Sequence, residues 1–266
     1  MTTETTGDDL ALATAAALEA GELLRGFWSR RDELDVTTKR SGDFVSQADT
    51  EADSLLKTIL RGARPNDGWL GEESGETPSG SRRWIVDPLD GTTNFLRGIP
   101  HWAVSIALEV EGTLTLGVIH DPIKQETFTA ASDQGAHLNG VAIGHSQAEE
   151  FDRALVGTGF PFGQMAHIDD HAADASRILP HCAGIRRMGA ASLDLAYVAA
   201  GRLDGFWERI LQPWDIAAGL VLLREGGVSV EGWSPNERPE ETGSVIAAAP
   251  GIFDTLASLL RGDEQS

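Results

Sequence analysis

The stretch that decides the fold of this chain is Trp84-Ile85-Val86-Asp87-Pro88-Leu89-Asp90-Gly91-Thr92-Thr93-Asn94-Phe95. Its first three residues are apolar and predict a short buried strand. Pro88 has no backbone N–H, so we expect the strand to end there and to leave Asp87 and Asp90 on a tight loop. Gly91 allows a sharp turn, and the two threonines that follow supply hydroxyl and free N–H groups where a short helix could begin.

A helix start with free N–H groups and a positive dipole end suits a phosphate. Two carboxylates beside a phosphate make physical sense only if cations lie between them. The stretch therefore predicts a Mg²⁺-dependent phosphate-ester site. Asp-Pro and Asp-Gly are also common turn dipeptides, so these residues taken alone leave a purely structural role open.

The chain has 266 residues, enough for one domain or for two tightly joined halves. Acidic residues outnumber basic ones 41 to 21, which gives a formal net charge of −20. This balance disfavours nucleic acid and anionic membranes as partners. It also repels phosphorylated substrates, so an anion site in this chain would need a metal ion to reverse the local field.

Cys182 is the single cysteine, so no intrachain disulfide can form and a reducing compartment is expected. Residues 1–9 include acids but no basic residue, so we expect no secretory signal. No apolar run approaches the ~20 residues of a membrane span. These features predict a cytoplasmic protein without a membrane partner.

The first part of the chain predicts an α+β half over residues 1–145. Helices are expected at about 8–29 and from Ser46 to about 61, where Asp49 is sufficiently explained as a helix cap. The polar segment 30–45, which contains Lys39, predicts a loop or a weak hairpin. A strand at 68–70 leads into Glu72, and strands at about 102–110, 113–120 and 126–131 form an antiparallel meander.

From about residue 146 the pattern changes to alternating strands and helices, which predicts an α/β half over residues 146–266. Strands are expected at 154–158, 184–188, 204–208 and 244–249, and helices at about 164–179, 191–200, 213–225 and 251–261. Pro213 fits the first turn of its helix and places Asp215 within that turn. Stabilisation of the helix dipole would be a sufficient reason for Asp215.

Four carboxylates, Glu72, Asp87, Asp90 and Asp215, thus fall at ends of predicted strands or helices. Hard divalent cations prefer oxygen ligands, and Mg²⁺ combines a few carboxylates with phosphate oxygens. The seven histidines show no zinc-ligand spacing. Magnesium is therefore the expected metal.

Three separated motifs in this order, Gly71-Glu72-Glu73-Ser74, Trp84–Phe95 and Trp214–Gly219, resemble the inositol monophosphatase family. The resemblance covers nearly the whole chain, includes the segment Arg187–Tyr197, and is closest to the bacterial inositol-1-monophosphatases. It implies a layered αβαβα sandwich of the sugar-phosphatase type, and a homodimer.

The resemblance also implies a metal-ligand set. Glu72, Asp87 and the backbone carbonyl of Leu89 would hold a first Mg²⁺, and Asp87, Asp90 and Asp215 a second, with Asp87 bridging the two. A third, weaker ion would lie near Glu72, so that each subunit would bind two or three ions.

Further roles follow from the same resemblance. Backbone N–H groups of Gly91 and Thr92 would bind the phosphate, Glu72 and Thr92 would position the attacking water, and Asp49 would polarise Thr92. Lys39 would belong to a mobile loop that closes over the site. The residues expected to contact the substrate are Asp90, Ala191, Glu208 and Asp215.

The resemblance implies hydrolysis of inositol monophosphate by direct attack of water, with inhibition by Li⁺. Nucleotide-specific relatives tend to carry Lys where this chain has Thr93, so Thr93 favours inositol phosphate, as does Glu208. A histidinol-phosphate phosphatase of the same family is the main alternative. A regulatory or nucleic-acid-binding protein that retains the fold is a second alternative, which the complete ligand set and the acidic charge disfavour.

Overall fold

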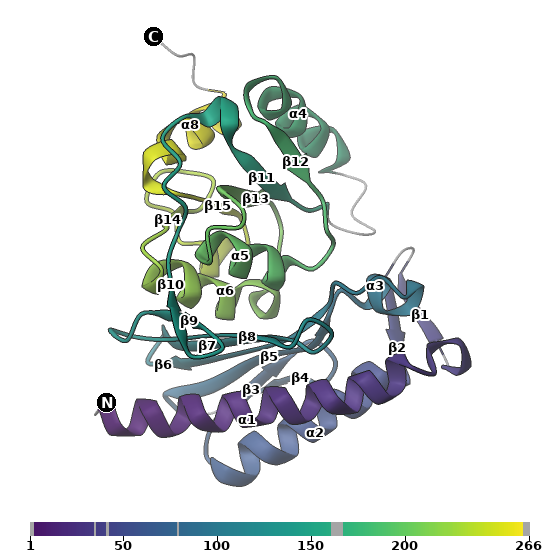
Figure 1. Ribbon diagram of the computed structural model, residues 1–266. Coiled ribbons are helices and arrows are strands. Elements are labelled where there is room, and N and C mark those ends of the chain that lie inside the picture. Colours follow the sequence, from purple (N-terminus) through teal and green to yellow (C-terminus); the bar gives the residue numbers. More distant parts are fainter. Residues whose placement is uncertain (1–2, 35, 41–42, 79, 161–166, 263–266) are drawn as a thin grey trace.

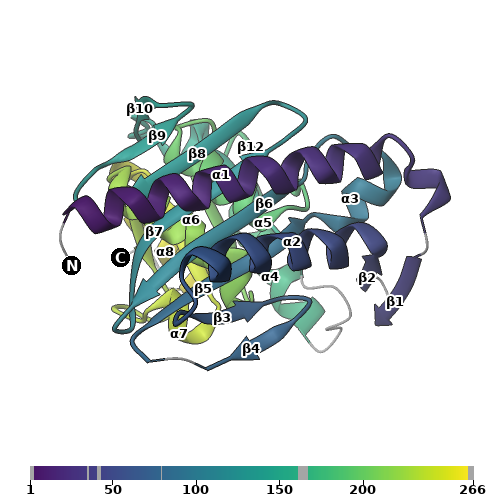
Figure 2. The same cartoon turned by 90° about the horizontal axis from the view of Figure 1, so that it is seen from below.

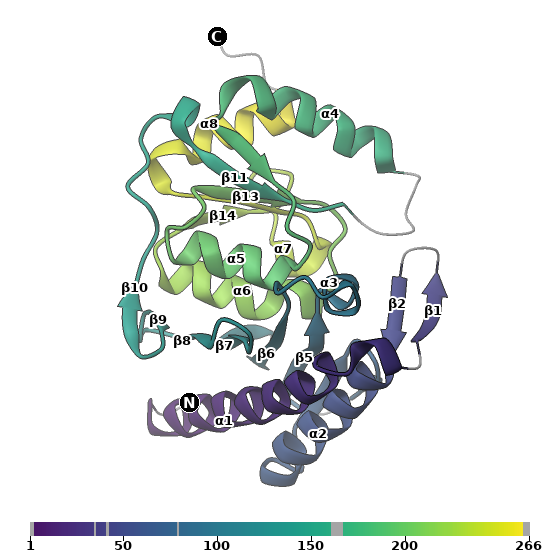
Figure 3. The same ribbon diagram turned by 45° about the vertical axis from the view of Figure 1, so that its right-hand side comes forward.

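The computed structural model describes residues 3–34, 36–40, 43–78, 80–160 and 167–262. Five layers follow one another in Figure 3: two long helices, a large sheet, two central helices, a smaller sheet and two outer helices. This is the layered mixture of helices and two sheets predicted from the sequence, and the prediction is confirmed.

The first layer is formed by α1 (Thr3–Trp28) and α2 (Gln47–Ala63), which lie side by side across one face of the large sheet (Figures 1 and 2). Alanine and leucine at helical spacing line the buried face of α2, as at Ala52, Leu56 and Leu60. In the sequence between these two helices, the strands β1 (Val36–Arg40) and β2 (Asp43–Ser46) form a hairpin. The hairpin predicted for this segment is therefore present, although the side chain of Lys39 lies outside the described part.

The large sheet has eight strands among the described residues, in the order β10-β9-β8-β7-β6-β5-β3-β4. Their bounds are β3 (Gly68–Gly71), β4 (Gly75–Thr77), β5 (Arg82–Asp90), β6 (Ala103–Val110), β7 (Thr113–Asp121), β8 (Glu126–Ala131), β9 (Ala136–Leu138) and β10 (Val141–Ile143). All neighbours pair antiparallel except β3 and β5, which run parallel. Because helices cover both faces, the inner strands are nearly continuous apolar runs.

Strand β5 does not end at Pro88, as the sequence predicted, but continues to Asp90. The register with β6 is regular up to Asp87↔Ser105, shifts, and resumes at Asp90↔Ala103. Pro88 falls inside this irregularity, where its missing N–H removes no regular ladder bond. The irregularity lies at the strand end that carries both carboxylates.

The second sheet has five strands in the described chain, in the order β12-β11-β13-β15-β14. The strands are β11 (Leu155–Thr158), β12 (Gly184–Arg186), β13 (Gly205–Glu208), β14 (Ser229–Glu231) and β15 (Val245–Ala248), and the helices are α3 (Thr92–Arg97), α4 (Ile168–Ile178), α5 (Ala191–Ala199), α6 (Pro213–Glu225), α7 (Pro239–Thr242) and α8 (Pro250–Arg261). Short 3₁₀ turns occur at Arg31–Glu33, Phe151–Arg153 and Leu179–His181. Helices α4 and α8 cover the outer face, and α5 and α6 lie between the sheets (Figure 3).

The central layer packs closely because small residues meet at its contacts. A Cβ added to Gly117 of β7 would overlap the backbone of Ala218 in α6, and one added to Gly219 would overlap the side chain of Leu195 in α5. Helix α6 therefore approaches the large sheet closely and brings its first turn to the end of β5. No described helix is long and apolar enough to span a membrane.

Candidate active site

The sheet pairing brings the first three carboxylates together. Glu72 follows β3, and its N–H donates to the carbonyl of Val86 in β5 over 3.2 Å. Because β3 and β5 are parallel, this bond places Glu72 beside Asp87 at the same end of the sheet. Asp90 ends β5, and α6 supplies Asp215 from the adjacent layer.

Burial and the charges of neighbouring carboxylates both change the pKa values of these groups. Burial raises the pKa of Asp87 well above its ordinary value, and the charges of Glu72, Asp90 and Asp215 raise it further. Burial also raises the pKa of Asp215 well above the ordinary value, and Asp90 and Glu72 add to this effect. Four like-charged groups so close together need a cation to be ionised together.

Each of the three aspartates is fixed through one carboxylate oxygen. Asp87 Oδ1 accepts from the N–H of Leu89 over 2.9 Å, and Asp215 Oδ2 from the N–H of Gln212 over 2.7 Å. Asp90 Oδ2 accepts from both the N–H and the hydroxyl of Ser192, over 2.8 and 2.5 Å. A carboxylate held at one oxygen can present the other to a cation. A structural role of Asp215 at the start of α6, such as the predicted stabilisation of the helix dipole, is therefore compatible with a ligand role.

The donor set suits magnesium, although the protein side chains alone do not form a complete metal site. Among the residues the structure describes, no group of three or more His, Cys, Asp or Glu side chains is arranged so that it could hold a metal ion by itself. Mg²⁺ usually binds through one or two carboxylates and keeps water and phosphate oxygens as its other ligands. The carboxylates and the carbonyl of Leu89 are all hard oxygen donors, so they fit such an ion.

The start of α3 offers a close approach to the backbone. Gly91, the residue before this helix, has φ 90°, a left-handed conformation that favours glycine. A Cβ there would lie 3.1 Å from the carbonyl oxygen of His101 and 3.2 Å from Cβ of Ala190. The N–H groups at Gly91 and Thr92 therefore belong to a compact turn next to Asp90, as the sequence predicted for a phosphate contact.

Asp49 has two roles in the structure. Its Oδ2 accepts from the N–H and the hydroxyl of Ser46, which caps α2 as the sequence predicted. Its Oδ1 accepts from the Thr92 hydroxyl over 2.9 Å. Since Thr92 also lies 3.0 Å from the carbonyl oxygen of Leu89, the hydroxyl is held between a carboxylate and the end of β5.

Two of the expected substrate contacts, Glu208 and Ala191, come from the second sheet and the central layer. Glu208 ends β13, and only 6% of its surface is exposed. Burial raises its pKa well above the ordinary value, and the charges of Asp215 and Asp194 add to this effect. Ala191 begins α5 and is half-buried. Glu208 therefore belongs to the same acidic region as the other carboxylates.

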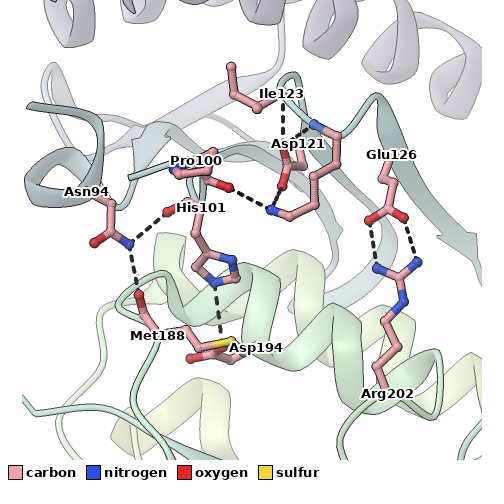
Figure 4. A network of polar contacts seen from close by, with 10 residues as sticks. Asn94, Pro100, His101, Asp121, Ile123, Glu126, Met188, Asp194 and Arg202 are labelled. Carbon is pink, nitrogen blue, oxygen red and sulfur yellow. Dashed lines mark hydrogen bonds and ion pairs between the residues drawn. The ribbon is translucent and has the colours of Figure 1, made fainter. Parts of the chain in front are cut away.

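Several residues that support the site were not predicted. Ser192, which binds Asp90, lies inside the segment Arg187–Tyr197, yet nothing in its spacing indicated a contact with β5. Figure 4 shows two others: Asn94 donates to the carbonyls of His101 and Met188, each over 2.8 Å. The ring of His101 also faces Asp194, with Nε2 3.8 Å from Oδ1. These contacts join the turn after β5 to the segment before α5.

Comparison with known proteins agrees with this geometry. The chain matches the model of the inositol monophosphatase family over residues 8–264. It is 43% identical to an inositol-1-monophosphatase of Rhizobium meliloti (strain 1021) over 252 residues, covering 92% of this chain and 93% of that protein. It is 38% identical to the Nus factor SuhB of Escherichia coli (strain K12) over 256 residues, covering 96% of each chain.

A solved structure shows the same fold. The extragenic suppressor protein suhB of Bartonella henselae superposes with a TM-score of 0.92 at 40% identity, covering 95% of this chain and 98% of that one. The family predicted from the three motifs is therefore confirmed. By the match of its whole length, its fold and its motifs, the chain belongs to the inositol monophosphatase family.

Proposed function

We propose that the chain is a Mg²⁺-dependent phosphomonoesterase that hydrolyses inositol monophosphate to inositol and phosphate. The observation that carries this proposal is that Glu72, Asp90 and Asp215 lie around Asp87 and raise the pKa of this buried carboxyl, next to the backbone turn at Gly91. Without cations, the mutual repulsion of these carboxylates opposes their ionisation. With cations bound, the same group would attract a substrate that is itself an anion.

In this proposal each residue has a definite task. The N–H groups of Gly91 and Thr92 donate to the phosphate oxygens, and Glu72 and the Thr92 hydroxyl orient the attacking water. Asp49 accepts the Thr92 hydroxyl proton in a hydrogen bond, which leaves a lone pair of that oxygen directed at the water. Magnesium held by Glu72, Asp87, Asp90, Asp215 and the carbonyl of Leu89 would neutralise the phosphate, acidify water and stabilise the departing oxygen. Water attacks the phosphorus directly, and no phosphoenzyme forms.

The substrate side rests on Glu208 and Ala191, with Asp90 and Asp215 contacting the substrate beside their metal role. A buried carboxylate that faces the site suits the vicinal hydroxyl groups of inositol, which can donate to it. The name of the Rhizobium relative supports the same substrate. Histidinol phosphate remains the alternative, since its amine could also pair with Glu208.

The rest of the proposal extends the family pattern to this chain. It comprises two or three Mg²⁺ per subunit, a homodimer, a cytoplasmic location, a mobile loop containing Lys39, and a division into residues 1–145 and 146–266. One relative is named a Nus factor. The net charge of −20 disfavours nucleic acid as the main partner of this chain.

The test compares phosphate release from inositol 1-phosphate, histidinol phosphate and p-nitrophenyl phosphate with Mg²⁺, for the wild type and Glu208→Ala. A hydrogen bond to a charged group contributes about 1.5–3 kcal/mol, so kcat/KM for inositol phosphate should fall roughly 10- to 150-fold. The aryl ester lacks these hydroxyl groups and should lose far less. Glu19→Ala, which removes an exposed glutamate on α1, is the matched control. Equal losses for both esters, or a wild type that prefers histidinol phosphate, would refute the inositol assignment.

A further inference from the structure

The carboxylate of Glu208 lies next to Gly159, in the space where a side chain of residue 159 would begin. Gly159 follows β11, which runs parallel to β13, and the two strand ends lie side by side. An ideally placed Cβ at Gly159 would come closer than 3.0 Å to all three terminal atoms of Glu208, namely Cδ, Oε1 and Oε2. The space that the carboxylate occupies therefore exists only because residue 159 has no side chain.

This glycine is not required by its backbone. Many glycines in the described chain have φ between 66° and 90°, where a side chain is strained, but Gly159 is not among them. A left-handed φ is therefore no reason for glycine at this position. The remaining reason for glycine at this position is the space taken by Glu208.

The backbone around Glu208 is held on both sides. The residue before it, Trp207, accepts at its carbonyl a hydrogen bond of 2.8 Å from the hydroxyl of Thr158. The residue after it, Arg209, binds the fully buried Asp174 of α4 through Nε over 2.8 Å and Nη2 over 3.1 Å. Glu208 therefore cannot avoid a new side chain at residue 159 by shifting its backbone.

Two further features fix Arg209 and the loop behind it. The guanidinium carbon of Arg209 lies 3.2 Å from the centroid of the Trp233 ring. Ile210 has φ 64°, which is disfavoured for a β-branched residue and persists only where the surroundings impose it. Arg209 is thus held by Asp174 and Trp233, and these contacts hold the strand end that carries Glu208.

We infer that Gly159 is a specificity-determining position: it gives the Glu208 carboxylate its place, while Asp174 and Arg209 hold the strand end that carries it. This inference rests on the proposed function, in which Glu208 accepts hydrogen bonds from the hydroxyl groups of the substrate. Neither Gly159 nor Asp174 touches the reacting atoms, so both act as positioning residues.

The experiment is a double-mutant cycle with Gly159→Ala and Glu208→Ala, measured as the ratio of kcat/KM for inositol 1-phosphate to kcat/KM for p-nitrophenyl phosphate. Gly159→Ala should lower this ratio roughly tenfold or more, because the displaced carboxylate loses its charged hydrogen bonds. In the Glu208→Ala background the same change should have almost no further effect, since the methyl group then meets no carboxylate. A general structural defect would lower the ratio equally in both backgrounds.

Gly184→Ala is the matched control, because Gly184 lies in β12 of the same sheet and its added Cβ would meet only the side-chain end of Arg186 at 3.3 Å and Leu155 Cδ1 at 3.7 Å. It should leave the ratio unchanged. Arg209→Lys provides an independent variant if Gly159→Ala does not fold, since lysine keeps the charge but loses the two-point contact with Asp174. It should also lower the ratio.

The outcomes separate the two proposals. If Glu208→Ala leaves the ratio unchanged, the substrate role of Glu208 fails and the role of Gly159 fails with it. If Glu208→Ala lowers the ratio but Gly159→Ala or, in its absence, Arg209→Lys does not, the inference about Gly159 is overturned and the proposed function stands. Additive losses in the cycle would overturn it as well.

Discussion

Replacement of Asp49 by asparagine tests whether this residue acts on the chemistry or only caps α2. The two oxygens of Asp49 serve different partners: Oδ2 accepts from the N–H and hydroxyl of Ser46 over 2.9 and 2.6 Å, and Oδ1 accepts from the Thr92 hydroxyl over 2.9 Å. Asparagine has one acceptor oxygen and one NH₂ donor group. It can therefore keep the cap or the contact with Thr92, but not both.

The size of the effect follows from these contacts. Ser46 is the N-cap of α2 and Asp49 completes the capping box from the third helical position, so loss of this contact should cost about 1 kcal/mol, and we expect the amide oxygen of asparagine to keep accepting from Ser46. The NH₂ group would then face the Thr92 hydroxyl, which would turn toward the carbonyl of Leu89, 3.0 Å away. Stability should fall by at most about 1 kcal/mol. The kcat/KM should fall at least ~10-fold, about 1.4 kcal/mol of transition-state stabilisation, because Thr92 no longer orients the water.

The assay combines thermal melting of the metal-free protein with kcat/KM in Mg²⁺. Ser46→Ala is the control: it removes one capping hydroxyl but not the Oδ1 contact, so it should lower stability by about 1 kcal/mol with a small effect on turnover. Thr92→Val should lose activity to a similar degree as Asp49→Asn. The double variant should lose little more than either single one, because Asp49 acts through Thr92. Wild-type activity in Asp49→Asn, or fully additive losses, would refute this role.

Three further predictions concern the metal site and the carboxylates. Asp90→Asn and Asp215→Asn should melt near-normally without metal but lose at least ~10²-fold in kcat/KM, about 2.7 kcal/mol; wild-type activity in either would leave that residue with a structural role only. Activity should need Mg²⁺, disappear in EDTA and be inhibited by Li⁺; full turnover in chelator, or dependence on Zn²⁺ alone, would contradict the site. Burial raises the pKa of Asp194 from 3.8 to about 6, so this group lowers the stability of the metal-free protein as pH rises through that interval. Other buried carboxylates contribute to the same pH dependence, so the test is the difference between two proteins: across this range the wild type should lose of order 3 kcal/mol more stability in chemical denaturation than Asp194→Asn, and parallel curves would refute it.

Local signals predicted where several of the candidate site residues lie in the fold, because these residues stand where helices or strands begin or end. The S-x-x-D pattern at Ser46 predicted the start of α2, and Pro213 predicted the start of α6 at the residue where it begins. The prediction that β5 ends at Pro88 was wrong. Proline usually ends a strand, but here a register irregularity accommodates it. The interruption of the ladder was correctly placed, but the strand continues beyond it.

The supporting contacts could not be predicted, because they join segments that only the packing of the two sheets brings together. Ser192 lies in α5 and binds Asp90 of β5, and both residues are buried. A serine near a helix start is usually explained by local capping, so its type and position gave no reason to look for a distant carboxylate. The contact between Gly159 and Glu208 could not be predicted either, since a glycine after a strand ordinarily indicates a turn.

Asn94 belongs to the motif Trp84–Phe95 and also makes long-range contacts. In the sequence it is only one residue of the stretch after Gly91, yet its Nδ2 bridges the carbonyls of His101 and Met188 from within α3. The His101 carbonyl is the same group that would lie 3.1 Å from a Cβ placed on Gly91. A single buried amide therefore connects the turn at Gly91 with the segment that leads into α5, whose Ser192 donates to Asp90. The central motif therefore positions the segment that leads into α5 as well as its own turn, through one buried amide that donates to two carbonyl groups.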